Sequence, residues 1–575
     1  MKVMWQAGGQ RAWGFRGRAF FARAGGAFFL LAGAGCGSLR EAAPAAGRDA
    51  QLLEYRGEAA QLRGLPLTRE VAVERETREA LLRTLEAELD KPENCRFLAE
   101  TERLLRQFRV LNAGVPLRDL YVRLMGEQVA AYYDPEKKRV AYVDAPAAGQ
   151  KGETPVSGPL VERFVYVHEF CHAVEDAHFD LDRLGKAALS DLDRNLALTA
   201  FIEGNAVLVG ADSLCGAFPG NTATPLGAFL VSALGRLELA QETAGALKEC
   251  PAFLGGALLR PYLDGAVFCN RLRRDAGWQA LNAAYRSHLP SSTAEILYPE
   301  RRYLRPFTPA VFSPEAGLFA GARQGGLTNS LGVLGTALWL GGEKVVSARQ
   351  FGFLKGWMGD RVDLFEGTDG VTRTVWLSYW ERPGMARAFR RQAERRLGGV
   401  AFKGVPSCVR REGRLVAAVW ATGTNADVSV CERLASCALR TRVTAETPSL
   451  PASWWFDAPW PVEVSANGAG LLGGYGAEFR AGPGYFRFDL ASGVLLRAET
   501  NPDRHYYGTL GGLLRHVEDA RSDFTFWKVP LVASWHRQGE GDARRFRWTM
   551  LGGFLADGDR QRARVLFVPV WRAER

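Results

Sequence analysis

The chain has 575 residues, of which 47% are hydrophobic and 24% are charged. This balance is typical of a folded globular protein and excludes a largely disordered chain, and the length predicts two to four domains. The formal net charge is +10, but the first 35 residues hold five basic side chains and no acidic one. Subtracting these five leaves +5 on the other 540 residues. A charge this small excludes a strongly basic nucleic-acid-binding protein, and we expect no nucleic-acid partner.

The start of the chain has the pattern of a secretory signal peptide. Basic residues end at Arg23, an apolar run covers residues 24–35, and small residues stand before Cys36. This ending resembles the lipobox of bacterial lipoproteins, although Gly33 occupies a position where leucine is usual. We therefore expect a signal peptide over 1–35, acylation of Cys36, and export to the periplasm or outer membrane with the lipid as the only membrane anchor. A cleaved signal peptide without lipidation is the alternative.

The following segments predict a tether and then a mainly helical domain over residues 61–440. Residues 36–60 are rich in Ala, Gly and Arg without hydrophobic periodicity, which is typical of a flexible tether. The expected elements are a strand at 71–73, helices at 76–89 and 95–108, hairpin strands at 128–133 and 139–143, and helices at 161–177, 192–212, 243–285 and 327–340. The second hairpin strand, 139–143, is predicted to lie at a sheet edge, where an extended peptide could pair with it.

Residues 441–575 differ in composition from the rest of the chain. They are dense in Trp, Tyr, Phe and Gly and contain short alternating stretches, which predicts a β-rich C-terminal module. Segments 510–514 and 527–530 recur weakly 41 and 39 residues later, at 551–555 and 566–569. Two copies predict a pair of similar hairpins packed together. The expected fold class is therefore α+β, with a mainly helical domain followed by a β-rich module.

One motif in the expected helical domain carries chemistry. His168, Glu169 and His172 form the pattern HExxH inside the helix expected at 161–177. Residues four apart on a helix share a face and lie about 6 Å apart along the axis, so both imidazoles can bind one zinc ion. Glu169 stands beside the first ligand and can accept a proton from a water molecule that the metal activates. The competing interpretation is a buried helix with two hydrogen-bonded histidines.

The third protein ligand is either His178 or Glu203. His178 has the spacing of the metzincin pattern, but that pattern needs a glycine seven residues after the first histidine so that the chain can turn back to the metal. Glu175, a good helix former, occupies this position. A helix that continues through it would place His178 about 15 Å along the axis from His168 and on another face. Glu203, in the next long helix, gives the gluzincin arrangement, which we favour.

Further segments around this motif carry a resemblance to a known family. They are residues 63–66, 132–135, 176–180, 203–204, 261–265, 277–285, 292–300 and 356–361. Together they resemble a family of exported proteins of bacteria and haloarchaea that are classed as gluzincin-like zinc metallopeptidases, over roughly residues 60–440. The resemblance implies the metallopeptidase fold and a zinc ion held by His168, His172 and Glu203. Tyr298 stands where the family more often has histidine, and its hydroxyl could donate to an oxyanion.

Asp176 is a further candidate because it lies one turn after His172. A carboxylate in this place can orient a ligand histidine, although a solvated or helix-capping role is the alternative. The whole pattern predicts peptide-bond hydrolysis in the cell envelope, with Zn2+ as cofactor, Glu169 as general base and a peptide or protein as substrate. The alternative is a non-catalytic envelope lipoprotein with a structural zinc helix that acts as a binding or scaffold protein. Glu169 favours the enzyme, since a structural site needs no such carboxylate.

Overall fold

The computed structural model describes residues 45–445, apart from 112–113, 129–130, 144–158, 189–190, 215–249, 304–306, 320–321 and 324–325, together with the strands between residues 462 and 574. The expected signal peptide and Cys36 lie outside the described residues. Part of the expected tether is described and is helical, as α2 (Ala45–Arg63), which packs against α6. The prediction of a flexible tether is therefore wrong from residue 45 onward. Four buried apolar side chains at helical spacing explain this packing: Leu52, Tyr55, Ala59 and Leu62.

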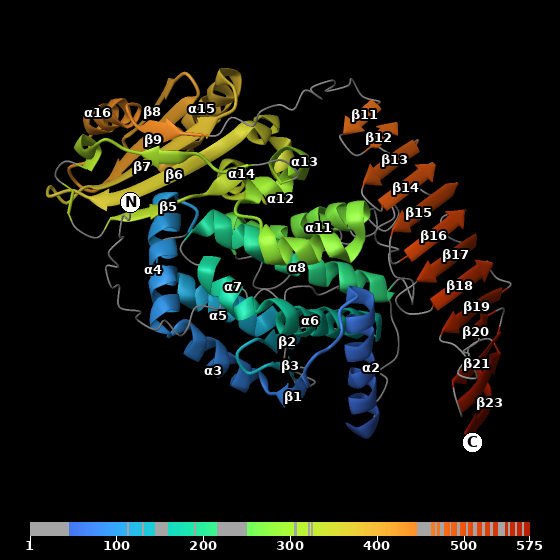
Figure 1. Ribbon diagram of the computed structural model, residues 1–575. Coiled ribbons are helices and arrows are strands. Elements are labelled where there is room, and N and C mark those ends of the chain that lie inside the picture. Colours follow the sequence, from blue (N-terminus) through green and yellow to red (C-terminus); the bar gives the residue numbers. More distant parts are fainter. Residues whose placement is uncertain are drawn as a thin grey trace, which may run out of the picture.

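Three long helices form the centre of the molecule (Figure 1): α6 (Pro159–Phe179), α8 (Leu192–Leu214) and α11 (Ala252–Ser287). α8 packs against both of the others and is buried along almost its whole length, which accounts for its apolar sequence. The helices expected at 161–177 and 192–212 are confirmed, and α11 covers most of the one expected at 243–285. Within the described residues, no helix is long and apolar enough to cross a membrane.

α8 and α11 approach each other most closely at two glycines. A methyl group on Gly204 would lie 2.2 Å from the carbonyl carbon of Gly265, and one on Gly265 would lie 1.8 Å from the carbonyl oxygen of Ala200. Neither position has room for a side chain unless a backbone moves. This crossing fixes the position of Glu203 on α8 and of Tyr262 on α11, because each stands within one helical turn of a contact glycine.

Smaller elements at the N-terminal side form a helical layer and a short sheet. The helices are α3 (Arg78–Leu89), α4 (Pro92–Gln107) and α5 (Leu117–Gln128), and the strands are β1 (Ala72–Glu76), β2 (Ala131–Asp134) and β3 (Arg139–Val143). β3 is the central strand, with β1 parallel on one side and β2 antiparallel on the other. The prediction that 139–143 is an edge strand is therefore wrong, because β1 occupies its outer side. The edge strands of this sheet are β1 and β2.

A five-stranded antiparallel sheet lies above the central helices in Figure 1, in the order β5-β6-β7-β9-β8. The helix expected near 327–340 is confirmed from residue 332 onward, and a short strand occupies 327–329 before it. With these strands the expected mainly helical domain is mixed α and β. The elements are β5 (Leu327–Asn329), α14 (Gly332–Gly341), β6 (Trp357–Glu366), β7 (Thr372–Trp380), α15 (Pro383–Leu397), β8 (Ser407–Glu412), β9 (Leu415–Thr422) and α16 (Val428–Ala438).

An aromatic cluster joins this sheet to the end of α4. Phe108 packs edge-on against Trp339, Trp376 and Trp420, with ring centroids 6.0, 5.4 and 4.9 Å away. Trp339 Nε1 also donates to the carbonyl oxygen of Phe108 at 3.2 Å. Edge-to-face aromatic contacts of this kind stabilise a core beyond the area they bury.

Shorter elements complete this part of the chain: α7 (Leu181–Ala188), α12 (Thr293–Leu297), α13 (Pro299–Arg302), β4 (Val311–Ser313) and β10 (Arg442–Thr444).

The C-terminal region consists of consecutive antiparallel strands, as the sequence predicts. They form a nine-stranded sheet, β11 to β19 in chain order, and a four-stranded sheet, β20 to β23. The strands are β11 (Val462–Ser465), β12 (Gly468–Leu471), β13 (Ala477–Gly482), β14 (Tyr485–Leu490), β15 (Leu496–Asn501), β16 (Arg504–Thr509), β17 (Leu514–Asp519), β18 (Phe524–Val529), β19 (Ala533–Gln538), β20 (Arg547–Thr549), β21 (Gly552–Asp557), β22 (Arg560–Val565) and β23 (Val568–Glu574).

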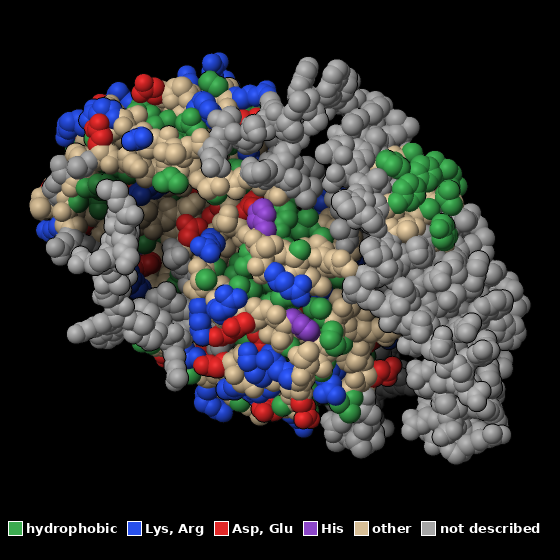
Figure 2. Space-filling model, in the orientation of Figure 1, with side chains coloured by type: hydrophobic (Ala, Val, Ile, Leu, Met, Phe, Trp, Pro, Cys, Tyr) green, Lys and Arg blue, Asp and Glu red, His purple; other side chains and the backbone are tan. Residues whose placement is uncertain are grey.

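In the first copy of the weak repeat, residue 514 lies on β17 and residues 527–529 lie on β18. In the second copy, residues 552–555 lie on β21 and residues 568–569 lie on β23, so the described parts of the two copies do not form the same kind of hairpin. The two copies are not packed directly together, because β19 pairs with β18 and β20 pairs with β21 between them. Several hydrophobic side chains of the larger sheet are exposed, including Phe479, Phe486 and Tyr507. Figure 2 shows a hydrophobic patch over β13 to β15.

Candidate metal centre

α6 presents His168, Glu169 and His172 to the interior of the molecule. The helix is unbroken from Pro159 to Phe179, so the two histidines, four residues apart, lie on one face. Their exposed fractions are 1%, 0% and 5%, in the order of the chain. Because a buried carboxylate or imidazole needs a partner to offset its lost hydration, these side chains must interact with other groups nearby.

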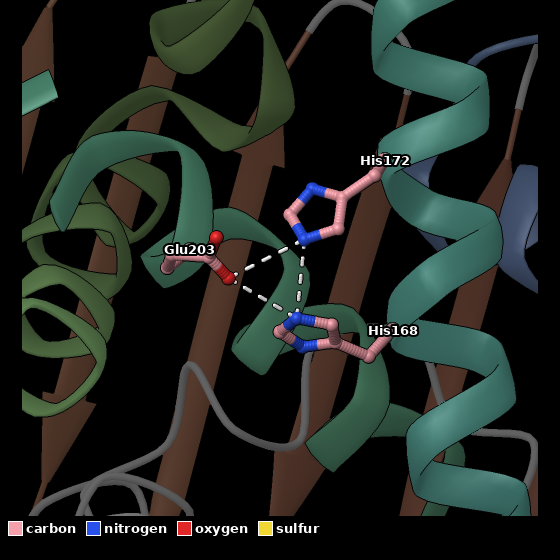
Figure 3. A group of neighbouring side chains, drawn as sticks. All are labelled: His168, His172 and Glu203. Carbon is pink, nitrogen blue, oxygen red and sulfur yellow. Dashed lines mark hydrogen bonds and ion pairs between the residues drawn. The ribbon is translucent and has the colours of Figure 1, made fainter. Parts of the chain in front are cut away.

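Glu203 on α8 supplies that interaction (Figure 3). Its Oε2 lies 3.2 Å from His168 Nε2 and 3.3 Å from His172 Nε2, and the two nitrogens are 3.1 Å apart. A tetrahedral zinc ion with bonds of about 2.0–2.1 Å holds its ligand atoms about 3.3 Å from one another. The three atoms therefore have the spacing of three corners of such a tetrahedron. Among the described residues, no other three His, Cys, Asp or Glu side chains form such a group.

The protonation states of Glu203, His168 and His172 favour binding of a cation. Burial would raise the pKa of Glu203, but His172 and the hydrogen bonds to both histidines outweigh it and lower that pKa to about 2. Burial lowers the pKa of His168. It would also lower that of His172, yet the charge of Glu203 raises the pKa of His172 to about 9. An ionised carboxylate thus faces a proton on His172, and a metal ion can displace that proton.

Glu169 lies beside the three ligand atoms, and only one of its two carboxylate oxygens has a hydrogen-bond partner among the described residues. Its Oε2 accepts a hydrogen bond of 2.9 Å from the backbone N–H of Tyr133 on β2. Its Oε1 is buried and has no hydrogen-bond partner among the described residues. Burial raises the pKa of Glu169 well above its ordinary value, although nearby His172 acts in the opposite direction. The free oxygen is where this side chain can accept a proton from a water molecule.

Comparison with known proteins does not assign the chain to a family. No family model, no curated protein and no solved structure matches it. The function is therefore inferred from the residues of the site.

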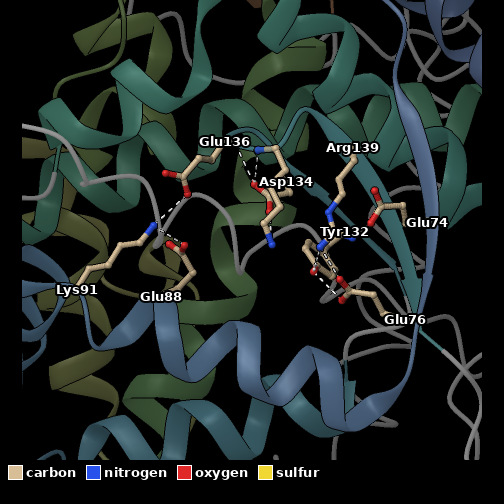
Figure 4. Close-up of polar contacts among 9 residues, drawn as sticks. Glu74, Glu76, Glu88, Lys91, Tyr132, Asp134, Glu136 and Arg139 are labelled. Atoms are coloured by element: carbon tan, nitrogen blue, oxygen red, sulfur yellow. Dashed lines mark hydrogen bonds and ion pairs between the residues drawn. The ribbon is translucent and has the colours of Figure 1, made fainter.

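β2 is fixed beside the site by polar contacts with its neighbours (Figure 4). The Tyr132 hydroxyl donates to Glu76 at 2.8 Å, and Arg139 forms ion pairs with Glu74 and Glu76 of β1. At the end of β2, Asp134 Oδ1 accepts two backbone N–H groups of the turn at 3.0 and 3.1 Å. These contacts link all three strands. They hold the backbone of β2 in register next to Glu169.

Asp176, the candidate for orienting a ligand histidine, contacts other groups instead. Its Oδ2 accepts hydrogen bonds of 2.7 Å from the Tyr133 hydroxyl and from Lys138 Nζ, and it forms an ion pair with Arg69. Its Oδ1 accepts the backbone N–H of Leu181 at 2.9 Å, at the start of α7. Asp176 therefore anchors the side chain of Tyr133, whose backbone binds Glu169. It stabilises the general-base candidate through β2 and not a histidine ring.

Two other candidates from the sequence are His178 and Tyr298. His178, in the last turn of α6, contacts the carbonyl oxygen of Pro66 at 2.8 Å, which agrees with its exclusion as a ligand. Tyr298 is half-buried where α12 ends and α13 begins. In the described part of the chain, neither His168 nor His172 has a hydrogen-bond partner at Nδ1.

Two buried tyrosines near Glu203 were not predicted as site residues. The ring of Tyr262 on α11 stacks towards His168, with centroids 6.3 Å apart and an interplanar angle of 21°. Tyr121 on α5 is buried, and its pKa is raised by burial and then by the charge of Glu203. Tyr262 falls in segment 261–265, which contributes to the family resemblance. Its place at the site depends on the crossing of α8 and α11, which the sequence does not reveal.

Proposed function

We propose that this protein is a zinc-dependent peptidase whose metal ion is held by His168, His172 and Glu203. The observation that carries the proposal is the triangle of two imidazole nitrogens and one carboxylate oxygen with sides of 3.1, 3.2 and 3.3 Å. Two nitrogen donors and one oxygen donor suit zinc, and three protein ligands leave a coordination position for catalysis. A purely structural zinc site takes four protein ligands, which this group does not supply among the described residues.

Glu169 supports hydrolysis as the reaction. When bound, a zinc ion supplies Lewis acidity, which polarises the scissile carbonyl and acidifies a water molecule. Glu169 Oε1 accepts a proton from water as the water oxygen adds to the carbonyl carbon. It returns this proton to the leaving nitrogen when the C–N bond breaks, so one water is consumed and two chain ends are released. The hydrogen bond from Tyr133 to Oε2 keeps Oε1 as the oxygen that acts.

The edge of β2 that pairs with no described strand supports a peptide as the substrate. The N–H of Tyr133 points to Glu169 and away from β3, and backbone groups alternate between the two sides of a strand. The N–H and C=O of Ala131, two residues earlier, therefore face the same side as Tyr133. An extended peptide can pair with this edge, and its scissile bond would then lie close to Glu169. Export and a lipid anchor at Cys36 would place this activity in the cell envelope.

The test compares Glu169→Gln with the wild type on a broad peptide library. The substitution removes the base but retains the volume and the N–H contact at one oxygen. We expect peptide cleavage to fall about 10²–10⁴-fold while zinc content, measured by elemental analysis, stays the same. Glu162→Gln, on the same helix α6 but in its first turn, is the matched control and should retain activity.

Two outcomes would contradict the enzyme. Cleavage by Glu169→Gln at the wild-type rate would remove the general base from the mechanism. The other contradicting outcome is a fully zinc-loaded wild type that cleaves nothing in the library, before or after limited proteolysis. That second result would favour the non-catalytic lipoprotein with a structural zinc helix.

A further inference from the structure

Two cysteines lie where α16 packs against β8, the last strand of the five-stranded sheet (Figure 1). Cys408 of β8 pairs in register with Val419 of β9, which in turn pairs with Val375 of β7. Directly paired residues of neighbouring strands point to the same face of a sheet. Val375 and Val419 are buried in the hydrophobic cluster that α16 shares with this face, so Cys408 continues their row at the edge of the sheet.

Cys431 reaches the same cluster from the helix. The buried positions of α16 are Cys431, Ala435 and Ala438, which are three or four residues apart and therefore form one stripe. The Sγ of Cys431 donates to the carbonyl oxygen of Pro406 at 3.4 Å, and Pro406 precedes Cys408 by two residues. Both sulfur-bearing side chains belong to the cluster. The contact between helix and sheet therefore brings the two thiols together across one interface.

The two thiols differ in their access to solvent. Cys431 is fully buried, whereas Cys408 is partly exposed. Burial and, next in size, the neighbouring Cys408 thiol raise the pKa of the Cys431 thiol to about 12. A thiolate is the form that attacks a disulfide, and the attack also needs access to it. Cys408 is therefore the cysteine that reacts first with an oxidant from the solvent.

We propose that Cys408 and Cys431 form a disulfide bond, which joins the edge strand β8 to α16, when the protein meets a thiol–disulfide oxidant. The Cys408 thiolate attacks the oxidant, which leaves a mixed disulfide on Cys408 and releases one thiolate. The Cys431 thiolate then attacks the Cys408 sulfur and releases the second. Two S–H bonds are lost and one S–S bond forms, while the oxidant takes up two electrons and two protons and becomes two thiols. The compartments to which the sequence predicts export hold oxidants of this class.

The surrounding backbone tolerates this oxidation. The carbonyl oxygen of Pro406 loses the hydrogen bond from Cys431 but still accepts the N–H of Ala421 at 3.1 Å. The bond would close a loop over residues 408–431, which contains β9 and the start of α16. Among the described strands, β8 pairs with β9 alone. A covalent link from β8 to α16 would therefore give this edge strand a second attachment and restrict the unfolded chain.

The test maps the disulfide bonds of the full chain after incubation in a buffer of oxidised and reduced glutathione. The remaining thiols are alkylated, the protein is digested without reduction, and the peptides are identified by mass spectrometry. We expect a linked pair of peptides that contain Cys408 and Cys431 and that separate when a reductant is added. In the wild type, oxidation should also lower the equilibrium constant for unfolding about 10²–10³-fold, as is typical for a loop of this size. Cys408→Ser should lack both the linked pair and this gain.

Cys437→Ser is the matched control. Cys437 lies on the same helix and packs against the same cluster, but its Sγ is 4.0 Å from the position that a methyl group on Gly317 would take, beside another segment. This variant should retain the linked pair and the gain in stability. Alkylated thiols at both Cys408 and Cys431 after oxidation would overturn the proposal, as would a link from either of them to Cys437. An equal effect of oxidation on the stability of the wild type and Cys408→Ser would overturn the second attachment of β8.

Discussion

The crossing of α8 and α11 makes a sharp prediction about Gly204→Ala. The new methyl group would lie 2.2 Å from the carbonyl carbon of Gly265, 2.4 Å from its oxygen and 2.7 Å from the nitrogen of Ala266. Ordinary contacts begin near 3.4 Å, so the shortest of these is too short by about 1.2 Å. Every atom that the methyl group meets belongs to the backbone and cannot rotate away. The two helices must therefore separate.

The cost follows from two opposing effects. Overpacking of a core typically costs about 1–3 kcal/mol, and backbone contacts place this substitution at the upper end or beyond. Replacing a helical glycine by alanine gains about 1 kcal/mol from helix propensity. We therefore expect Gly204→Ala to lower the free energy of unfolding by about 2 kcal/mol or more. A separation of about 1.2 Å is also more than half of a zinc–oxygen bond of about 2.0–2.2 Å, so zinc affinity should fall as well.

The assay is denaturant unfolding of the zinc-free protein, followed by zinc titration. Gly57→Ala is the control, because Gly57 is an exposed glycine of α2 with no other atom within 4 Å of an added methyl group. It should stabilise the protein by about 1 kcal/mol and leave zinc binding unchanged. If Gly204→Ala unfolds at the same denaturant concentration as the wild type, the helices do not cross at this glycine as described.

Two further predictions concern the metal ligands and a buried carboxylate. Glu203→Ala should abolish stoichiometric zinc binding and His178→Ala should retain it, as measured by elemental analysis after dialysis; the reverse pattern would refute the choice of third ligand. Burial raises the pKa of Asp193 to about 7, so the folded protein holds a proton there that the unfolded chain releases above its ordinary pKa of 3.8. The stability that this proton provides is complete below the ordinary pKa of 3.8 and is lost as the pH rises through the folded-state pKa of about 7. Relative to Asp193→Asn, the wild type should therefore lose stability between pH 5 and pH 7, by at most about 1.4 kcal/mol per pH unit. Curves of unfolding free energy against pH that run parallel for the two proteins would contradict this.

The parts of the site that depend on local spacing were predictable. His168 and His172 share a face because helical geometry requires it, and Glu175 in place of glycine correctly indicated that the helix runs on past His178. The choice of Glu203 followed from excluding His178, and the structure brings its carboxylate to both histidines. Each of these inferences needed only the period of a helix and the identity of one residue.

The parts that depend on contacts between distant segments were not predictable. β1 pairs with β3 more than sixty residues later, so nothing local showed that β3 is central and that β1 and β2 are the edges. β6 and β9 are buried on both faces along most of their length, and this removes the alternation by which a strand is recognised. Tyr262 reaches the site only through the meeting of Gly204 and Gly265. Such contacts are properties of the folded chain and leave no periodic signal.

The early start of α2 would limit where a protein anchored at Cys36 can work. Because α2 begins at Ala45 and packs against α6, only the eight residues 37–44 separate an acylated Cys36 from this helix. The nine Cα–Cα steps from Cys36 to Ala45 span at most about 30 Å even when the chain is fully extended. A protein tethered at Cys36 would therefore remain within about one small-domain diameter of the lipid headgroups. It would meet substrates that approach the membrane surface and miss those that stay deep in the aqueous compartment.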